Sequence, residues 1–222
     1  MPRPTPNRTI RRMYRDQQFQ VDDPEVIRAF IDANPFATLV AVDAAGRVAA
    51  THLPVLIEQF GTPTIFRCHL MRDTDHWHAV TQAQEVFVSF LGPDAPILAS
   101  WQSTMRFGGT WNYQVVHARA QPVPRDADTL VRHLKTLKDR FEVSPGHRFE
   151  HLPEGYVAAL TPMIQCFDLV VTELQCLFKL SQNRSDTEFK QTVAALTAQG
   201  GKSQLLADAM LAWQATRGAE RR

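Results

Sequence analysis

The sequence lacks the features that mark several large classes of protein. Its 222 residues include three cysteines, Cys68, Cys166 and Cys176, without paired spacing, so no disulfide framework is expected. No apolar run is long enough to span a bilayer, and no apolar signal-peptide core follows the start. The formal net charge is +1, so the chain does not carry the excess of Lys and Arg that a general nucleic-acid binder has. These absences predict a soluble, cytoplasmic protein with reduced thiols.

Familiar catalytic signatures are also missing. The chain has no GxGxxG or Walker loop, no HExxH helix and no Gly-x-Ser-x-Gly elbow. A bound phosphate must therefore be held by side chains and a helix start. The composition, 44% hydrophobic and 21% charged, indicates a globular chain. We expect a flexible, arginine-rich tail at residues 1–14, with a nucleic-acid arm as the alternative, and one domain over residues 15–222.

Short β-type runs dominate the predicted elements. A turn at residues 43–46 joins the first two as a hairpin, and Gly92-Pro93-Asp94 is expected to stop another. The strands are expected at residues 36–42, 48–53, 64–70, 86–90, 111–120, 164–174 and 177–180.

Helix-start signals separate these runs. Asp23-Pro24-Glu25 and Asp126 or Asp128 begin amphipathic segments, and Ser185-x-x-Glu188 is a capping box. Ser203 is expected to cap the last helix. The pattern predicts an α+β fold in which helices surround a small antiparallel barrel.

Two polar segments stand out in this apolar framework. Residues 179–184, Lys-Leu-Ser-Gln-Asn-Arg, lie where a strand gives way to a helix. Their cations, hydroxyl and amides are the donors that an anionic ligand needs. Thr110-Trp111-Asn112-Tyr113, which continues to His117, lies about seventy residues upstream. The open question is whether the two segments meet.

The eight histidines give no metal-binding pattern. His76, His78, His147 and His151 are expected to face solvent or to form hydrogen bonds, and no metal site is predicted. His52, His69 and His117 lie in strands beside apolar residues. Each is either a core imidazole or a group that faces a cofactor pocket.

Several motifs together resemble PaiB-type proteins, which are described as FMN-binding negative transcriptional regulators. The resemblance covers about residues 13–215. It rests on Pro35 to Val40, Thr51-His52-Leu53-Pro54, His69-Leu70, Gly92 to Ala95, Ser100-Trp101, Thr110 to His117 and Lys179 to Arg184.

The resemblance implies a split β-barrel of the flavin-reductase type with peripheral helices. It also implies a homodimer with an FMN cleft at the subunit interface, the phosphate near Lys179, Ser181 and Arg184, and the ring near Trp111 or Trp101. The implied cofactor-binding residues are His52, His69, Arg72, Trp77, Ser100, Trp101, Thr110, Trp111, Asn112, His117, Lys179, Ser181, Gln182 and Arg184.

The sequence departs from the family pattern in ways that leave alternatives open. A Gly-Lys usual before the last motif is Cys176-Leu177 here. Some PaiB-like proteins bind haem, so haem b is the alternative cofactor, with His69 or His76 as its axial ligand. The chain would then resemble piperazate synthases or a small-molecule oxidoreductase, and no catalytic residue is assigned. A barrel that binds no cofactor and acts as an interaction module is the third reading, and DNA contact has only the arginine-rich start to support it.

Overall fold

The computed structural model describes residues 16–101 and 108–220, so the predicted tail lies outside the described residues. The chain divides into two compact units, each described here by itself. The terminal unit consists of Met1–Asp22, Pro93–Gln114 and Gln175–Arg222, and the central unit of Asp23–Gly92 and Val115–Leu174. One domain over residues 15–222 stays a prediction.

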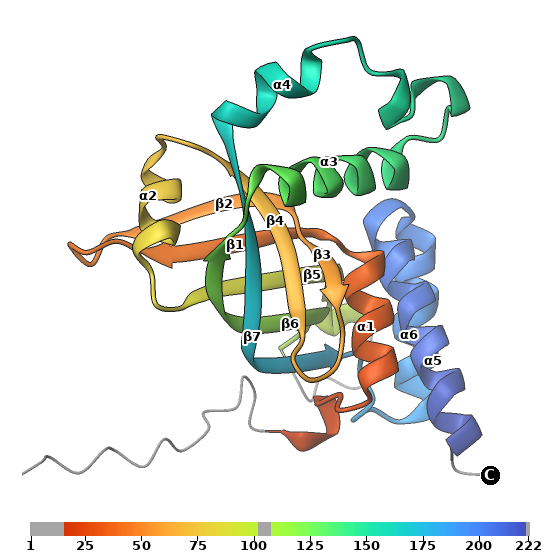
Figure 1. The fold of residues 1–222 in the computed structure, drawn as a ribbon. Coiled ribbons are helices and arrows are strands. Elements are labelled where there is room, and N and C mark those ends of the chain that lie inside the picture. Colours follow the sequence, from red (N-terminus) through yellow and green to blue (C-terminus); the bar gives the residue numbers. More distant parts are fainter. Residues whose placement is uncertain (1–15, 102–107, 221–222) are drawn as a thin grey trace, which may run out of the picture. The chain divides into compact units, whose positions relative to one another are not determined.

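Seven strands form the sheet, in the order β2-β1-β5-β6-β7-β4-β3 (Figure 1). Each pairing whose register is resolved is antiparallel. Strands β2 and β4 lie in contact without pairing, so the barrel is closed only in part. The predicted α+β fold, an antiparallel split β-barrel, is confirmed. The strands are β1 (Phe36–Val42), β2 (Val48–Pro54), β3 (Leu56–Gln59), β4 (Ile65–Met71), β5 (Val86–Ile97), β6 (Thr110–Pro124) and β7 (Ile164–Lys179).

Two predicted strand ends are wrong. Strand β5 does not stop at Gly92-Pro93 but continues to Ile97. Strand β5 pairs with β1 through Phe87 to Ser89. Pro93 lies beyond these paired residues, so the N–H that proline lacks is not needed for a hydrogen bond to β1. The two runs at the end of the chain are one strand, β7, because no glycine or proline interrupts it. The short strand β3 was not predicted.

Two helices of the central unit begin where the sequence predicts. Asp23 caps α1 (Pro24–Ala33), and Asp126 caps α3 (Ala127–Phe141) by accepting the backbone N–H of Thr129 at 2.8 Å. Thr74 caps α2 (Asp75–Gln82), and α4 (Tyr156–Leu160) is a single short piece. Helix α3 lies against β4 (Figure 1). Short 3-10 turns lie at Pro145–His147, Phe149–His151 and Thr161–Met163.

The terminal unit contains a pair of adjacent helices, α5 (Asp186–Gln199) and α6 (Gly201–Glu220) (Figure 1). The predicted capping box at Ser185 and Glu188 is present. Helix α6 begins at Gly201 rather than after Ser203, because the Gln204 N–H donates to Gly200 O at 3.3 Å and closes a turn earlier than predicted. Short 3-10 turns lie at Gln17–Phe19 and Ala99–Trp101.

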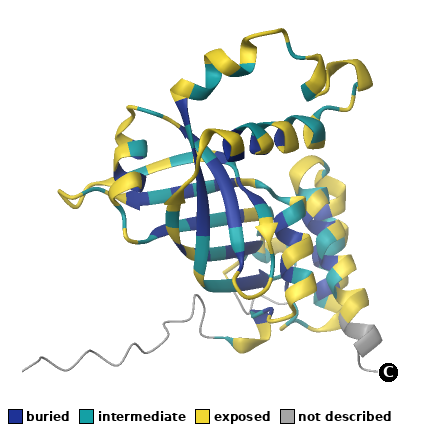
Figure 2. Ribbon diagram, in the orientation of Figure 1, coloured by how far each residue is buried: buried dark blue, intermediate teal, exposed yellow. Residues whose placement is uncertain are grey.

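Residues of β1 alternate between buried and less buried along the strand, as do residues at the start of β5, and Figure 2 shows buried residues in the strands of the sheet. In the central unit Leu39, Phe66, Val88 and Phe167 are fully buried and form the interior. Among residues 16–101 and 108–220, no helix has both the length and the apolar character needed to cross a membrane.

Candidate functional site

The two polar segments meet in the terminal unit, as the sequence led us to ask. Lys179 Nζ donates to Thr110 Oγ1 at 2.6 Å, and Asn112 Nδ2 donates to Ser181 Oγ at 2.8 Å. Asn112 and Ser181 are both buried. Two side-chain hydrogen bonds therefore join the start of β6 to the turn after β7.

The turn after β7 is shaped by its own polar side chains. Ser181 has a left-handed backbone with φ of 63°, which is uncommon outside glycine. Gln182 braces this turn, because its Oε1 accepts the Leu180 N–H at 2.7 Å and its Nε2 donates to Phe178 O at 2.5 Å. Gln182 thus positions the turn, while Ser181 and Arg184 face the space beside it.

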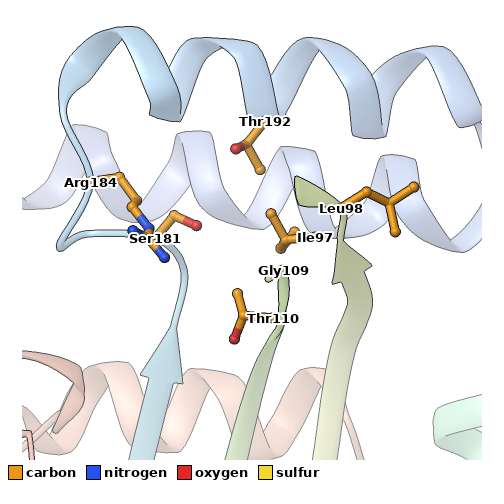
Figure 3. Close-up of a pocket in the computed structure, with 7 residues that line it drawn as sticks. All are labelled: Ile97, Leu98, Gly109, Thr110, Ser181, Arg184 and Thr192. Atoms are coloured by element: carbon orange, nitrogen blue, oxygen red, sulfur yellow. The ribbon is translucent and has the colours of Figure 1, made fainter. Parts of the chain in front are cut away.

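That space is a niche between β6, the turn and α5 (Figure 3). It holds about 230 Å³ between atoms, part of it open to solvent. Gly109 has φ of 87°, and a Cβ there would lie 2.9 Å from Ile97 O, so only glycine fits this wall. The niche is lined by Ile97, Leu98, Gly109, Thr110, Ser181, Arg184 and Thr192.

Two cations lie at or beside the niche. Burial lowers the pKa of Lys179, and the charge of Arg184 lowers it further, so the two cations influence each other. At the start of α5, Ser185 and Glu188 form a capping box, so the Glu188 N–H is already bonded. We name the four side chains Thr110, Lys179, Ser181 and Arg184 the phosphate cradle, after the group their chemistry suits.

Trp111 does not share a face with this cradle. Side chains alternate along a strand, so Trp111 points away from the side occupied by Thr110 and Asn112. Its Nε1 donates to Asp94 Oδ1 at 2.9 Å, and half of the residue stays exposed. Ser100 and Trp101 lie in a 3-10 turn next to residues outside the described ranges.

The other five predicted residues lie in the central unit. His52 stacks on Phe36 with ring centroids 6.2 Å apart, and His117 meets Phe87 edge-on at 4.8 Å. The guanidinium carbon of Arg72 lies 6.0 Å from the ring centroid of Trp77. The Nε of Arg72 donates to Ile164 O at 3.1 Å. The fifth, His69, lies in β4.

Sequence reasoning missed the neighbour of His69. The ring of His133 on α3 lies 5.3 Å from that of His69, and His133 is buried. Three and four residues separate His133 from Leu130 and Leu137, so helical spacing could have placed it on the buried face. His69 Nδ1, His133 Nε2 and both ring nitrogens of His76 are buried without a hydrogen-bond partner. The described residues contain no cluster of three or more His, Cys, Asp or Glu that could hold a metal ion.

The His133 imidazole is expected to make the protein sensitive to acid. Burial, helped by the nearby charges of His69 and Arg67, lowers the pKa of His133 from 6.5 to about 3. The unfolded chain therefore binds an extra proton between these values, and each pH unit below about 6 should remove about 1.4 kcal/mol of stability.

Chemical denaturation between pH 7 and pH 4 measures this loss. In His133→Leu this contribution to the slope should disappear, whereas in the matched control His151→Leu, at an exposed histidine, the slope should stay. An unchanged slope in a folded His133→Leu variant would contradict the assignment.

Comparison with known proteins places the chain in a family. The sequence model described as "Putative FMN-binding domain" matches residues 13–173. The chain belongs to this family. A relative from Bacillus subtilis, "Protease synthase and sporulation protein PAI 2", is 29% identical over 189 residues, which cover 83% of this chain and 89% of the relative. The resemblance to PaiB-type proteins is confirmed, and FMN, the predicted cofactor, is the one for which the family is named.

Two solved structures share the fold of this FMN-binding family member. The flavocytochrome Anf3 from Azotobacter vinelandii has a TM-score of 0.61 and 16% identity, covering 80% of this chain and 77% of that one. The "FAD and Heme binding protein" from Mycobacterium smegmatis has a TM-score of 0.58 and 17% identity, covering 82% and 80%. Identities this low show the fold alone.

The residues present fit one part of FMN. Two cations and two hydroxyls are the groups that suit a phosphate. The empty space at the niche, about 230 Å³, includes open solvent and is not an enclosed cavity. By their chemistry these residues match the phosphate end of FMN, and the ring system needs further walls.

Proposed function

We propose that this protein is an FMN-binding regulator of transcription that acts as a homodimer in the cytoplasm. The flavin lies in a cleft at the subunit interface, with its phosphate on the cradle of Thr110, Lys179, Ser181 and Arg184. The observation that carries the proposal is this cradle: Thr110, Ser181 and Arg184 line the niche, and Lys179 donates to Thr110 and is influenced by the charge of Arg184. Flavin supplies redox chemistry when bound, and the chain's own residues bind and orient it.

The open side of the niche supports the interface cleft. A site that holds the phosphate and leaves the ring uncovered is incomplete, and a second copy of the chain would supply the missing wall. A bound phosphate would also raise the pKa of Lys179 again. FMN affinity is therefore expected to fall as the pH rises through the lowered pKa of Lys179 in the free protein.

Regulation is proposed from family membership and from the Bacillus relative, whose name refers to protease synthesis and sporulation. Three basic side chains of α3 form ion pairs. Lys135 pairs with Asp139, Lys138 with Glu142 at 3.9 Å, and Arg140 with Asp32 at 3.5 Å. The DNA contact that we propose uses the arginine-rich residues 1–15, and otherwise the effect on transcription is indirect.

A haem-dependent enzyme on the same fold is the second candidate. The two ring nitrogens of His76 and the Nδ1 of His69 lie buried without partners, and burial lowers the pKa of both imidazoles, which keeps them neutral. A neutral imidazole is what an axial haem ligand requires.

The visible spectrum of the purified protein tests both candidates. We expect flavin bands, as purified or after incubation with FMN and removal of the excess. A Soret band that appears only with haemin, and is lost in His69→Ala or His76→Ala, would favour the haem enzyme instead. A protein that stays colourless after incubation with FMN and with haemin would overturn both the flavin-binding and the haem-binding proposal. Regulation is tested by comparing transcripts of strains that carry the wild type, a gene deletion, or Lys179→Ala.

A further inference from the structure

Asn112 is a buried amide whose two ends have different surroundings. Its Nδ2 donates to Ser181 Oγ at 2.8 Å and lies 3.7 Å from the sulfur of Met210. A thioether sulfur accepts hydrogen bonds and donates none, so the position of Met210 identifies the NH2 end of the amide as the end beside Ser181. Asn112 Oδ1 is buried without a hydrogen-bond partner among the described residues, and only 1% of the residue is exposed.

Stability does not account for an amide at this position. A buried amide oxygen without a donor lowers the stability of the fold, and such groups are rare in folded proteins. A leucine side chain has a similar size and could fill the space beside Met210 without this cost. The apolar side chain could not donate a hydrogen bond to Ser181, so that bond is the contribution that requires Asn112.

The bond from Asn112 limits what the Ser181 hydroxyl can do. The turn braced by Gln182 fixes the backbone of Ser181, whose φ is 63°. The Ser181 oxygen accepts from the NH2 group of Asn112, and an NH2 group of an amide cannot accept a hydrogen bond in return. The hydroxyl proton therefore points elsewhere, and no described residue accepts it.

The niche is the direction left to this proton. Ser181 lines the niche together with Thr110 and Arg184, and Figure 3 shows its oxygen pointing toward the side where Ile97 lies. A hydroxyl that already accepts one hydrogen bond is a stronger donor, because bonds in a chain polarise one another. Ser181 thus offers a proton to a ligand atom that accepts, and the oxygens of a phosphate are acceptors of this kind.

We propose that Asn112 is a positioning residue for the phosphate of the bound flavin. It holds the Ser181 hydroxyl as a donor that faces the niche, and it does not touch the ligand itself. The inference rests on the proposed phosphate site and goes beyond it by assigning a residue that acts through Ser181. FMN gains affinity from this arrangement, whereas riboflavin, which has no phosphate, does not.

Titration of flavin fluorescence with the full-length protein, using FMN and riboflavin in turn, tests the role of Asn112. We expect the wild type to bind FMN more tightly than riboflavin. Ser181→Ala should weaken FMN binding by about 10-fold, because one hydrogen bond to a charged group is lost. Asn112→Leu should weaken it by about 3- to 10-fold, since the released hydroxyl has about three staggered positions. Neither variant should change the affinity for riboflavin.

The double variant Asn112→Leu/Ser181→Ala separates positioning from packing. Because Asn112 acts only through Ser181, the double variant should bind FMN no more weakly than Ser181→Ala alone. It should also resist urea as well as the wild type does, because both partners of the bond have become apolar. The matched control is Gln114→Leu, which replaces a buried amide two residues along β6 and should leave both flavin affinities unchanged.

The failures of this proposal and of the phosphate site can be told apart. Equal affinity of the wild type for FMN and riboflavin would overturn the phosphate site and the role of Asn112 with it. A preference for FMN that Asn112→Leu leaves unchanged, or single losses that multiply in the double variant, would overturn the role of Asn112 alone. Equal losses for both flavins would assign Asn112 to packing instead. Circular dichroism checks folding, and Asn112→Ala, with the same expected selectivity, takes the place of an Asn112→Leu variant that does not fold.

Discussion

Replacing Lys179 with alanine is expected to weaken FMN binding by about 1.5–3 kcal/mol, or roughly 10- to 100-fold in the dissociation constant, because a charged hydrogen bond to the phosphate is lost. Lys179 reaches Thr110 at 2.6 Å and is influenced by the charge of Arg184, so its ammonium group lies among the other donors of the cradle. Quenching of flavin fluorescence on titration with protein measures the change.

The chain offers matched controls for this experiment. Lys190→Ala removes an exposed cation from α5 in the same unit and should leave the affinity unchanged. Lys179→Arg keeps the charge and should retain part of the binding. If Lys179→Ala and Lys190→Ala bind FMN equally well, the cradle is not the phosphate site.

Replacing Asp168 with alanine is expected to lower the free energy of unfolding by about 3–5 kcal/mol, because the buried guanidinium of Arg67 loses its buried partner. Asp168 accepts two bonds from Arg67, at 2.7 and 3.2 Å, and pairs with Arg125 at 3.3 Å. Arg67 also reaches Glu58 at 2.7 Å. Both Arg67 and Asp168 are buried on the paired strands β4 and β7, where water cannot replace a lost partner.

Urea unfolding followed by circular dichroism measures this loss. Glu173→Ala removes a partly exposed carboxylate that pairs with Arg119 at 3.6 Å, and it should change stability by about 1 kcal/mol or less. The double variant Arg67→Leu/Asp168→Leu removes both charges and should be clearly more stable than Asp168→Ala. Equal losses in Asp168→Ala and Glu173→Ala would show that the buried network contributes no more than a surface pair.

Local signals in the sequence predicted the elements whose ends are set by neighbouring residues. Asp23 and Pro24 define the start of α1, and Ser185 with Glu188 defines the start of α5 through bonds within four residues. The β-type runs at residues 36–42 and 48–53, joined by the turn at residues 43–46, predicted the β1–β2 hairpin for the same reason. The end of β5 was wrong, because whether Pro93 breaks a strand depends on which partner needs its N–H, and that partner is far away in the sequence.

The candidate site was likewise predictable from the sequence only in part. The polar motifs at 110–117 and 179–184 are visible in the sequence, whereas the turn conformation of Ser181 and the bonds from Lys179 to Thr110 and from Asn112 to Ser181 are not. For His133, helical spacing could indicate burial, but it could not show that the ring neighbour lies on a distant strand.

By itself, the sequence determined the family, through its motifs, and also the antiparallel barrel and most helix starts, since these depend on β-type runs, turns and short-range capping. The tertiary structure alone decided which donors lie together at the niche and which end of the Asn112 amide faces Ser181. These depend on pairing and packing between residues far apart in the chain, and local sequence does not encode them in readable form.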